Sequence, residues 1–167
     1  PAISLEGFQT DSRKVGVDVI IHSPNKLDIT GPAVFLAGSI EMGKARNWQT
    51  EVAEALDEFV VLNPRRPDWD STWEQSISNP QFVEQVEWEL KAMDLADVIL
   101  LHFEPDTKSP ITLLELGLHK NKCVVHCPPG FWRKGNVDIV CRWFDIDQAE
   151  SVKQGIERVQ IILGRLA

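Results

Sequence analysis

The hydrophobic positions of the chain fall into short apolar runs separated by longer stretches in which apolar residues recur every three or four positions. The runs predict strands, which we place at Ala33–Gly38, Val60–Pro64, Asp97–Phe103 and Cys123–Cys127. The longer stretches predict helices over residues 45–59, 81–95, the segment around Glu115, and 148–166. Strands that alternate with helices predict an α/β fold, Rossmann-like or flavodoxin-like, with a parallel sheet of about five strands and helices on both faces.

The first part of the chain carries the weakest pattern. Val15–Ile21 predicts an added strand or hairpin arm, so residues 1–31 are interpreted as an N-terminal strand extension without an assigned function. With 167 residues, of which 43% are hydrophobic, the chain is long enough for one well-buried core and too short for two ordinary domains. We therefore expect a single domain over residues 1–167.

The charge and the cysteines of the chain indicate which partners the protein can bind and in which compartment it functions. The formal net charge is -8, whereas a surface for polynucleotides needs clustered lysine and arginine. An odd number of cysteines without a disulfide framework is typical of a reducing compartment; the three are Cys123, Cys127 and Cys141. No apolar run approaches the ~20 residues of a membrane span, and the first residues lack a signal-peptide pattern. We therefore expect a soluble cytoplasmic protein that binds neither polynucleotides nor membranes.

Two predicted loops stand out. Residues 65–80 form a polar segment with tryptophans that is long for a compact domain, and such segments are usually lids or binding loops. A second loop, rich in proline and glycine, is predicted over residues 128–136.

Glu115 stands among leucines near the start of a predicted helix that follows a predicted strand. Ser109 and Pro110 supply a helix N-cap and a proline at the first helical position. Glu115 then lies near the edge formed by the carboxyl ends of the strands, where open α/β sheets bind ligands. The alternative is structural, because Thr112 and Glu115 have the spacing of a capping box. This stretch alone does not separate the two interpretations.

The helix over residues 81–95 contains glutamates that are not equivalent. Its apolar stripe consists of Phe82, Val86, Leu90 and Met93. Glu89 falls inside this stripe, whereas Glu84 and Glu87 point away from it. A carboxylate on a buried helix face is costly unless it is paired, hydrogen-bonded or protonated, which makes Glu89 a functional candidate. The alternative is that Glu89 reaches the edge of the stripe and pairs with a lysine or arginine.

The segment Gly38–Lys44 follows a predicted strand and has the glycine and lysine spacing of a phosphate-binding P-loop. Two residues oppose a nucleoside triphosphatase: Ala45 replaces the serine or threonine that holds magnesium, and Glu41 would repel phosphates. A milder interpretation is that Gly38 and Ser39, at a helix N-terminus, bind one anionic group or sugar hydroxyls. An ordinary tight turn between strand and helix explains the same residues.

Glu89 and Glu115 flank the same predicted strand, so both can reach the edge of the sheet. A pair of carboxyl groups suits cleavage of a glycosidic bond, because one attacks the sugar carbon while the other protonates the departing group. Two carboxyl groups at one edge of the sheet therefore suggest an acid and a nucleophile, whose separation the sequence does not give.

The histidines suggest no competing chemistry. His102 and His126 lie in apolar strand runs that are typical of the core, and we expect His22 and His119 at the surface. No pair of histidines has the spacing of metal ligands, so no metal is expected.

Three segments follow one another with a recognisable order and spacing: Val34–Ile40, then Glu89 with Leu95–Leu100 behind it, and Leu113–Gly117. Together they resemble the nucleoside 2-deoxyribosyltransferase superfamily, including its nucleoside 5'-monophosphate N-glycosidase branch. The resemblance covers roughly residues 33–138 and implies an enzyme that needs neither a metal nor an organic cofactor. It also implies that Glu115 is the nucleophile and that Glu89, where the family usually has aspartate, assists departure of the base.

The resemblance assigns substrate contacts to further positions. Phe35 stands where many members have a tyrosine, and Gly38 and Ser39 form the turn after the same strand. Asn136 matches an asparagine that some members lend to the neighbouring subunit's site, which implies a homodimer or a larger homo-oligomer. The expected ligand is a small nucleoside or nucleotide.

Ser109 bears on the 5' end of that ligand. Six residues before the nucleophile the transferases carry an aspartate that contacts the 5'-hydroxyl, whereas this chain has serine, as the monophosphate glycosidases do. Aspartate would repel a phosphate and serine would bond to it. The alternative is that Ser109 only caps its helix.

We therefore expect retaining cleavage or transfer at the N-glycosidic bond of a nucleoside or nucleoside 5'-monophosphate. Base exchange by a nucleoside 2-deoxyribosyltransferase is the alternative within this class. Outside it stand a magnesium-dependent phosphotransferase that uses the glycine loop, and a nucleotide-binding module without catalysis.

Overall fold

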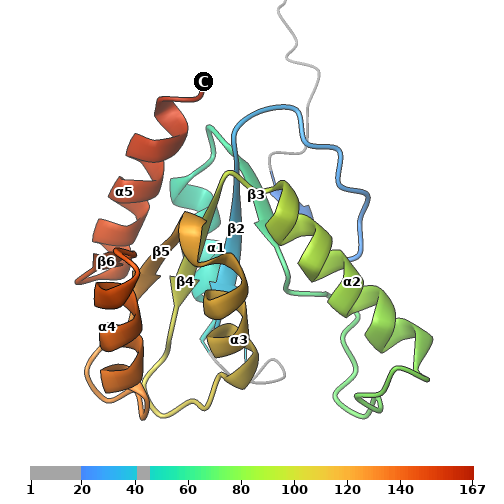
Figure 1. Cartoon of the computed structure of the whole chain (residues 1–167). Coiled ribbons are helices and arrows are strands. Elements are labelled where there is room, and N and C mark those ends of the chain that lie inside the picture. The colour runs from blue at the N-terminus through green and yellow to red at the C-terminus, as the bar shows by residue number, and fades with distance from the viewer. Residues whose placement is uncertain (1–19, 41–45) are drawn as a thin grey trace, which may run out of the picture.

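A six-stranded, fully parallel β-sheet forms the centre of the computed structural model, which describes residues 20–40 and 46–167 (Figure 1). The strand order across the sheet is β1-β3-β2-β4-β5-β6. The strands are β1 (Ile20–His22), β2 (Ala33–Gly38), β3 (Val60–Asn63), β4 (Val98–His102), β5 (Cys123–His126) and β6 (Asp147–Ala149). The central strands β2 and β4 are apolar apart from His102 at the end of β4, because helices cover both faces of the sheet.

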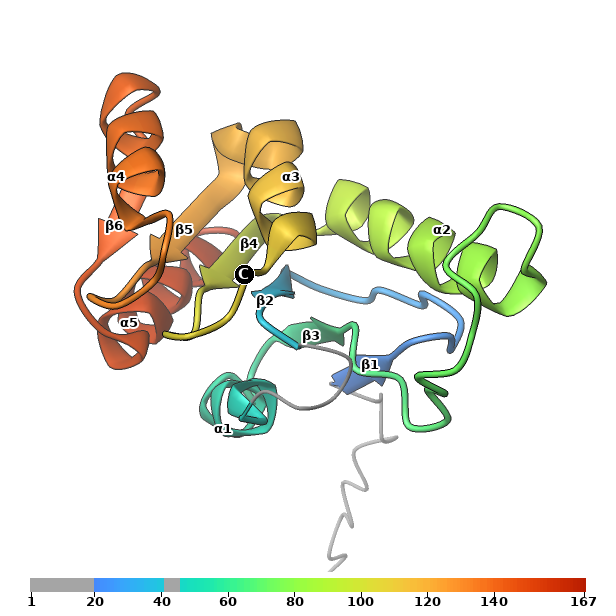
Figure 2. The same cartoon turned by 90° about the horizontal axis from the view of Figure 1, so that it is seen from below.

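Helices cover the sheet in two layers (Figure 2). They are α1 (Trp48–Ala55), α2 (Pro80–Leu95), α3 (Pro110–His119), the short 3-10 helix η2 (Lys120–Lys122), α4 (Lys134–Trp143) and α5 (Val152–Gly164). One hydrophobic cluster packs α2, α3 and α4 against one face, and a second packs α1 and α5 against the other. The described part of the chain is thus a three-layer α/β sandwich.

The chain changes direction across the sheet between β2 and β4. From β2 it passes through α1 to β3 on one side, and α2 then carries it back to β4 on the other side. Such a switch point opens a crevice at the carboxyl ends of the strands. Gly38 and His102 are register partners at these ends, so the segments that follow them meet at the crevice.

The predicted α/β class is confirmed, and the sheet has six strands where about five were expected. The additional strand is β6, which the apolar pattern missed because its residues are Asp147, Gln148 and Ala149. Part of the N-terminal strand predicted over Val15–Ile21 lies outside the described residues, and β1 pairs with β3 as an edge strand.

Three helix boundaries differ from prediction. The helix expected over residues 148–166 begins only at Val152, because residues 147–149 form β6. The helix expected over residues 45–59 is described only from Trp48 to Ala55, because the chain turns after Leu56 and the Phe59 amide donates to the Leu56 carbonyl at 3.0 Å. The helix α4 begins at Lys134, inside the loop predicted over residues 128–136. The predictions over residues 41–45, including Glu41, Lys44 and Ala45 of the glycine loop, lie outside the described residues.

Candidate active site

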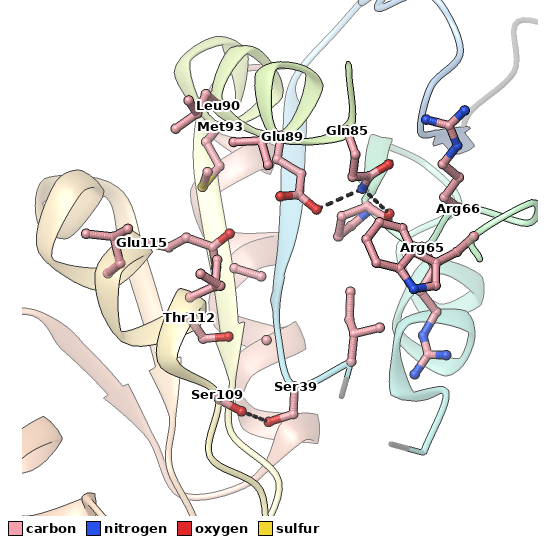
Figure 3. A pocket seen from close by; sticks show the side chains of 18 of the residues that line it. Ser39, Arg65, Arg66, Gln85, Glu89, Leu90, Met93, Ser109, Thr112 and Glu115 are labelled. Atoms are coloured by element: carbon pink, nitrogen blue, oxygen red, sulfur yellow. Dashed lines mark hydrogen bonds between the residues drawn. The ribbon is translucent and has the colours of Figure 1, made fainter. Parts of the chain in front are cut away.

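A pocket of about 700 Å³ lies at the crevice between β2 and β4 (Figure 3). Its walls come from the end of β2, the segment after β3, one side of α2 and the α3 helix. This volume is within the ~300–1,000 Å³ of small-molecule sites. The pocket therefore lies where the sheet topology places a ligand.

Glu115 projects from α3 into this pocket, although only 7% of its surface is exposed. The helix begins at Pro110, so Thr112 and Glu115 are both interior helical residues and the capping-box alternative is wrong. Burial, reinforced by the charge of Glu89, raises the pKa of Glu115 to about 8. The described residues give its carboxyl no hydrogen bond, so the group is available to a ligand.

The side of α2 that packs against the core is not the side that carries the apolar stripe. Its buried residues are Gln85, Trp88, Ala92 and Met93. Phe82, Val86 and Leu90 of the predicted stripe line the pocket instead, and 41% of Leu90 is exposed. The stripe is a wall of the pocket, which explains how it accommodates a carboxylate.

Glu89 lines the pocket from this wall. No described lysine or arginine forms an ion pair with it, so the alternative of a surface ion pair is not what the structure shows. Its partner is Gln85, whose Nε2 donates to Glu89 Oε1 at 2.8 Å. Burial raises the pKa of Glu89 to about 7, and the hydrogen bond from Gln85 opposes that rise.

The two carboxyl groups are directed into the same space between α2 and α3 (Figure 3). Their interaction is electrostatic, since the charge of Glu89 contributes to the raised pKa of Glu115. With pKa values of about 7 and about 8, the pair holds a single proton near neutral pH. The pocket then contains one carboxylic acid and one carboxylate, which is the combination that acid-assisted nucleophilic chemistry needs.

A cluster of hydroxyl groups lies at the end of the pocket away from Glu89 (Figure 3). Ser39 Oγ is 2.6 Å from Ser109 Oγ, and Thr107 Oγ1 is 2.9 Å from each of them. Ser109 occupies the N-cap position of α3, but its side chain makes no capping hydrogen bond, so capping does not explain it. Its backbone is left-handed, with φ 44° and ψ 50°, which is uncommon for serine.

The segment after β3 supplies another wall of the pocket through Arg65, Arg66 and Trp69. Arg66 is fixed by Asp68 and Glu84, at 2.8 Å and 2.7 Å. Arg65 Nε donates to Gln49 at 2.9 Å, and burial lowers the pKa of Arg65. The long loop predicted to bind therefore contributes two positioned guanidinium groups to the pocket.

Of the remaining residues that were predicted to contact the substrate, some line the pocket and others do not. Gly38 and Ser39 line the pocket. Phe35 is fully buried in the core under the helices α2 to α4 and is not part of the lining. Asn136 is exposed near the start of α4 and also lies outside the pocket of its own chain.

The histidines are arranged partly as expected. His102 and His126 are buried, with their Nδ1 atoms 2.8 Å apart, and His102 Nε2 lies 3.0 Å from Glu104 Oε1. The expectation of a surface location is wrong for His22, which is partly buried and lines the pocket, and for His119, whose side chain is 12% exposed. Among the described residues no group of three or more metal-ligating side chains is arranged around a common point.

A model of the nucleoside 2-deoxyribosyltransferase-like family matches residues 31–131. The chain belongs to this family. The match spans β2 to β5 and includes both carboxyl groups of the pocket. Proteins of the nucleoside 2-deoxyribosyltransferase-like family are glycosyl transferases or hydrolases that act on nucleosides. A search among curated proteins found no match.

The pocket combines carboxyl groups with hydroxyl groups. Small nucleosides are the ligands of the family, and they offer a glycosidic bond together with sugar hydroxyls.

Across the ranges that the structure describes, no helix is both long and apolar enough to cross a membrane.

Residues that the sequence pattern did not single out also belong to the site. Gln85 could have been found from its position one helical turn before Glu89, where side chains meet. Thr107 carries no such signal, because its contact with Ser39 joins residues that are 68 positions apart.

Proposed function

We propose that the protein is a retaining N-glycosyl hydrolase or transferase that cleaves a nucleoside or nucleoside 5'-monophosphate. The observation that carries this proposal is the presence of Glu89 and Glu115 in one pocket with raised pKa values. Family membership supports the same chemistry. In this proposal Glu115 is the nucleophile and Glu89 is the general acid and base.

The reaction proceeds in two displacements. Ionised Glu115 attacks C1', the bond from C1' to the base nitrogen breaks, its electron pair stays with the base, and Glu89 donates a proton to that base. Glu89, now ionised, then takes a proton from water as the water oxygen attacks C1' and Glu115 leaves as a carboxylate. Two inversions retain the configuration at C1'. A second base in place of water gives base exchange.

The location of the proton matters for this mechanism. Burial raises the pKa of both carboxyl groups, and the charge of Glu89 raises that of Glu115 further, which favours protonation of Glu115 before substrate binds. The reaction needs the proton on Glu89 and Glu115 in its ionised form. The positive charge that develops on the sugar favours this arrangement, because it stabilises the ionised form of Glu115.

The hydroxyl cluster supports recognition of a 5'-phosphate. Ser39 and Ser109 line the pocket beside the N-terminus of α3, whose free amides and dipole favour an anion. Thr107 contacts both hydroxyls and donates its own hydrogen to the Glu104 carbonyl, so it holds the two serines in place. Glu89 lies at the other end of the pocket, with Glu115 between (Figure 3). A nucleotide whose base contacts Glu89 would therefore direct its 5' end toward the serines.

Turnover is tested by incubating the protein with nucleosides and their 5'-monophosphates and following the free base by chromatography. Glu115→Gln should lower turnover by roughly 10³-fold or more, since no other group replaces a nucleophile. Glu87→Gln, on the exposed side of α2, is the matched control. Near-normal activity of the Glu115 variant refutes the assignment. Addition of a second base separates hydrolysis from exchange.

The 5'-phosphate is tested with a charge change at Ser109. The wild type should prefer the monophosphate in kcat/KM, and Ser109→Asp should narrow or reverse that preference because it adds a negative charge. Ser109→Asn is the neutral control of equal size, and both residues tolerate the left-handed backbone found here. A wild-type enzyme that uses nucleosides and ignores their monophosphates would assign the protein to the transferase side of the family.

A homo-oligomer is part of the proposal. The helices α3 and α4 expose large apolar residues at helical spacing, with exposed fractions from 57% to 81%: Ile111, Leu114, Leu118, Ile139 and Trp143. The three on α3 also line the pocket, so this surface includes its rim. Asn136 lies on α4 one turn before Ile139. A second copy on this surface would bury apolar area and bring Asn136 near a neighbouring pocket.

The three thiols are buried and free, which supports a reducing, cytoplasmic location.

A further inference from the structure

Gln85 is a buried polar residue of α2 with only 5% of its surface exposed. Its side chain makes three hydrogen bonds. Ser23 Oγ donates to Gln85 Oε1 at 2.5 Å, and Gln85 Nε2 donates to the Pro64 carbonyl at 2.9 Å and to Glu89 Oε1 at 2.8 Å. The amide thus connects the segment after β1, the segment after β3 and the proposed acid.

The partners fix the orientation of the amide. A backbone carbonyl can only accept a hydrogen bond, so the Gln85 atom that contacts Pro64 must be the nitrogen. Its oxygen then accepts from Ser23, and its second N–H points to Glu89. Reversing the amide would place two acceptors against each other at Pro64 and lose the donor to Glu89, at a cost comparable to unpaired buried polar groups.

This orientation determines which oxygen of Glu89 can carry a proton. Oε1 accepts from Gln85, so it is either a carboxylate oxygen or the carbonyl oxygen of the protonated acid. The acidic proton then belongs on Oε2, which points away from Gln85 toward the side of the pocket where Glu115 lies (Figure 3). We propose that Gln85 is a positioning residue that holds the transferable proton of Glu89 on Oε2, facing the departing base. The inference rests on the proposed function, in which Glu89 is the acid.

The same hydrogen bond affects the titration of Glu89. It stabilises the ionised form, so its removal should raise the pKa of Glu89 further. The other titratable side chains of the described pocket are His22, Arg65, Arg66 and Glu115, and none of them contacts Gln85 through a hydrogen bond. Loss of Gln85 should therefore shift the basic limb of the pH–rate profile to higher pH, because the acid stays protonated longer.

The experiment compares two leaving groups on the same sugar phosphate: a purine or pyrimidine base, which must be protonated, and p-nitrophenolate, which departs without a proton. Gln85→Met keeps the length of the side chain and removes the hydrogen bonds. We expect it to lower kcat on the nucleotide by roughly 10- to 100-fold, the range that misplacement of a catalytic group produces. On the nitrophenyl glycoside the variant should stay within about threefold of wild type, since no acid is needed.

Two further variants keep the test decisive. Gln85→Glu preserves size and polarity but cannot supply both amide donors, so it should show the same selective loss if Gln85→Met does not fold. Gln81→Met, an exposed glutamine on the same helix, should behave as wild type on both substrates. Equal losses on both leaving groups, without a shift of the basic limb, would overturn the positioning role and leave only a structural one.

The failure of this inference is distinguishable from failure of the proposed function. If Glu115→Gln retains activity, the two-carboxylate mechanism is wrong whatever Gln85 does. If Glu115→Gln is inactive on both substrates and Glu89→Gln is inactive on the nucleotide alone, the mechanism holds. Wild-type behaviour of the Gln85 variants in that case would refute the positioning role by itself.

Discussion

Replacement of Glu115 by glutamine should stabilise the fold at alkaline pH while it removes catalysis. The pKa of Glu115 rises from 4.5 to about 8 on folding, chiefly through burial. Below pH 4.5 the group is protonated in both the folded and the unfolded chain, so it does not distinguish them. As pH increases toward 8, the unfolded chain ionises and the folded chain keeps its proton, so the free energy of unfolding falls. Glutamine removes this penalty because it never ionises.

The magnitude follows from the displacement of the pKa. A single group displaced from 4.5 to about 8 costs at most ~5 kcal/mol of stability above pH 8. Solvent that enters an open pocket screens part of this energy, so we expect a gain of about 2–3 kcal/mol for Glu115→Gln at pH 8.5. For a chain of this size that corresponds to an increase in Tm of roughly 5–10 °C.

Thermal denaturation at pH 5 and pH 8.5 measures the effect. The Tm of Glu115→Gln should exceed that of wild type at pH 8.5 and lie close to it at pH 5. Glu87→Gln, which changes an exposed glutamate, should stay within ~0.5 kcal/mol of wild type at both pH values. A Tm difference that is independent of pH, or a less stable variant at pH 8.5, would contradict the buried-carboxyl argument.

Three other outcomes are expected. The pH–rate profile should be a narrow bell with its maximum between about 7 and about 8, because activity needs one proton on the pair of Glu89 and Glu115; a plateau to pH 10 would contradict this. Gly38→Ala should lower the free energy of unfolding by roughly 2–4 kcal/mol, measured with urea, since its Cβ would lie 2.2 Å from the His102 carbonyl oxygen. Ile139→Glu should reduce the mass measured by light scattering to that of a monomer. Asn136→Ala should keep the oligomer and lower kcat. A wild-type protein that is monomeric would exclude this interface.

The position of Glu115 follows from local sequence, and that of Glu89 does so only in part. A strand, a serine–proline start and a helix place Glu115 at the carboxyl edge of the sheet, as the structure shows. For Glu89, periodicity identifies the correct helical stripe but not its environment. The side of α2 that packs into the core carries Gln85, whose polar atoms form hydrogen bonds with backbone and side-chain groups that are distant in sequence. Helical spacing contains no information about such partners.

Contacts between distant segments limited the rest of the prediction. The side chain of Ser109 was expected to cap its helix, yet it contacts Ser39, which is 70 positions away. Phe35 was expected to contact the substrate, but the sheet turns its ring into the core and away from the pocket. The strand β6 lacks an apolar run and exists because β5 offers an unpaired edge. These features depend on tertiary pairing that a window of sequence does not contain.

The proposed acid and the proposed nucleophile are carried by two helices that join the same strand, β4, from its two ends. In the proposed function the segment from Pro80 to His119 therefore carries both groups that act on the glycosidic bond, whereas the long loop over residues 65–79 belongs to the preceding connection. This loop supplies a wall of the pocket and neither of those two groups. Exchanging that loop for one from another family member would offer a route to enzymes with a new range of bases and an unaltered bond-breaking step.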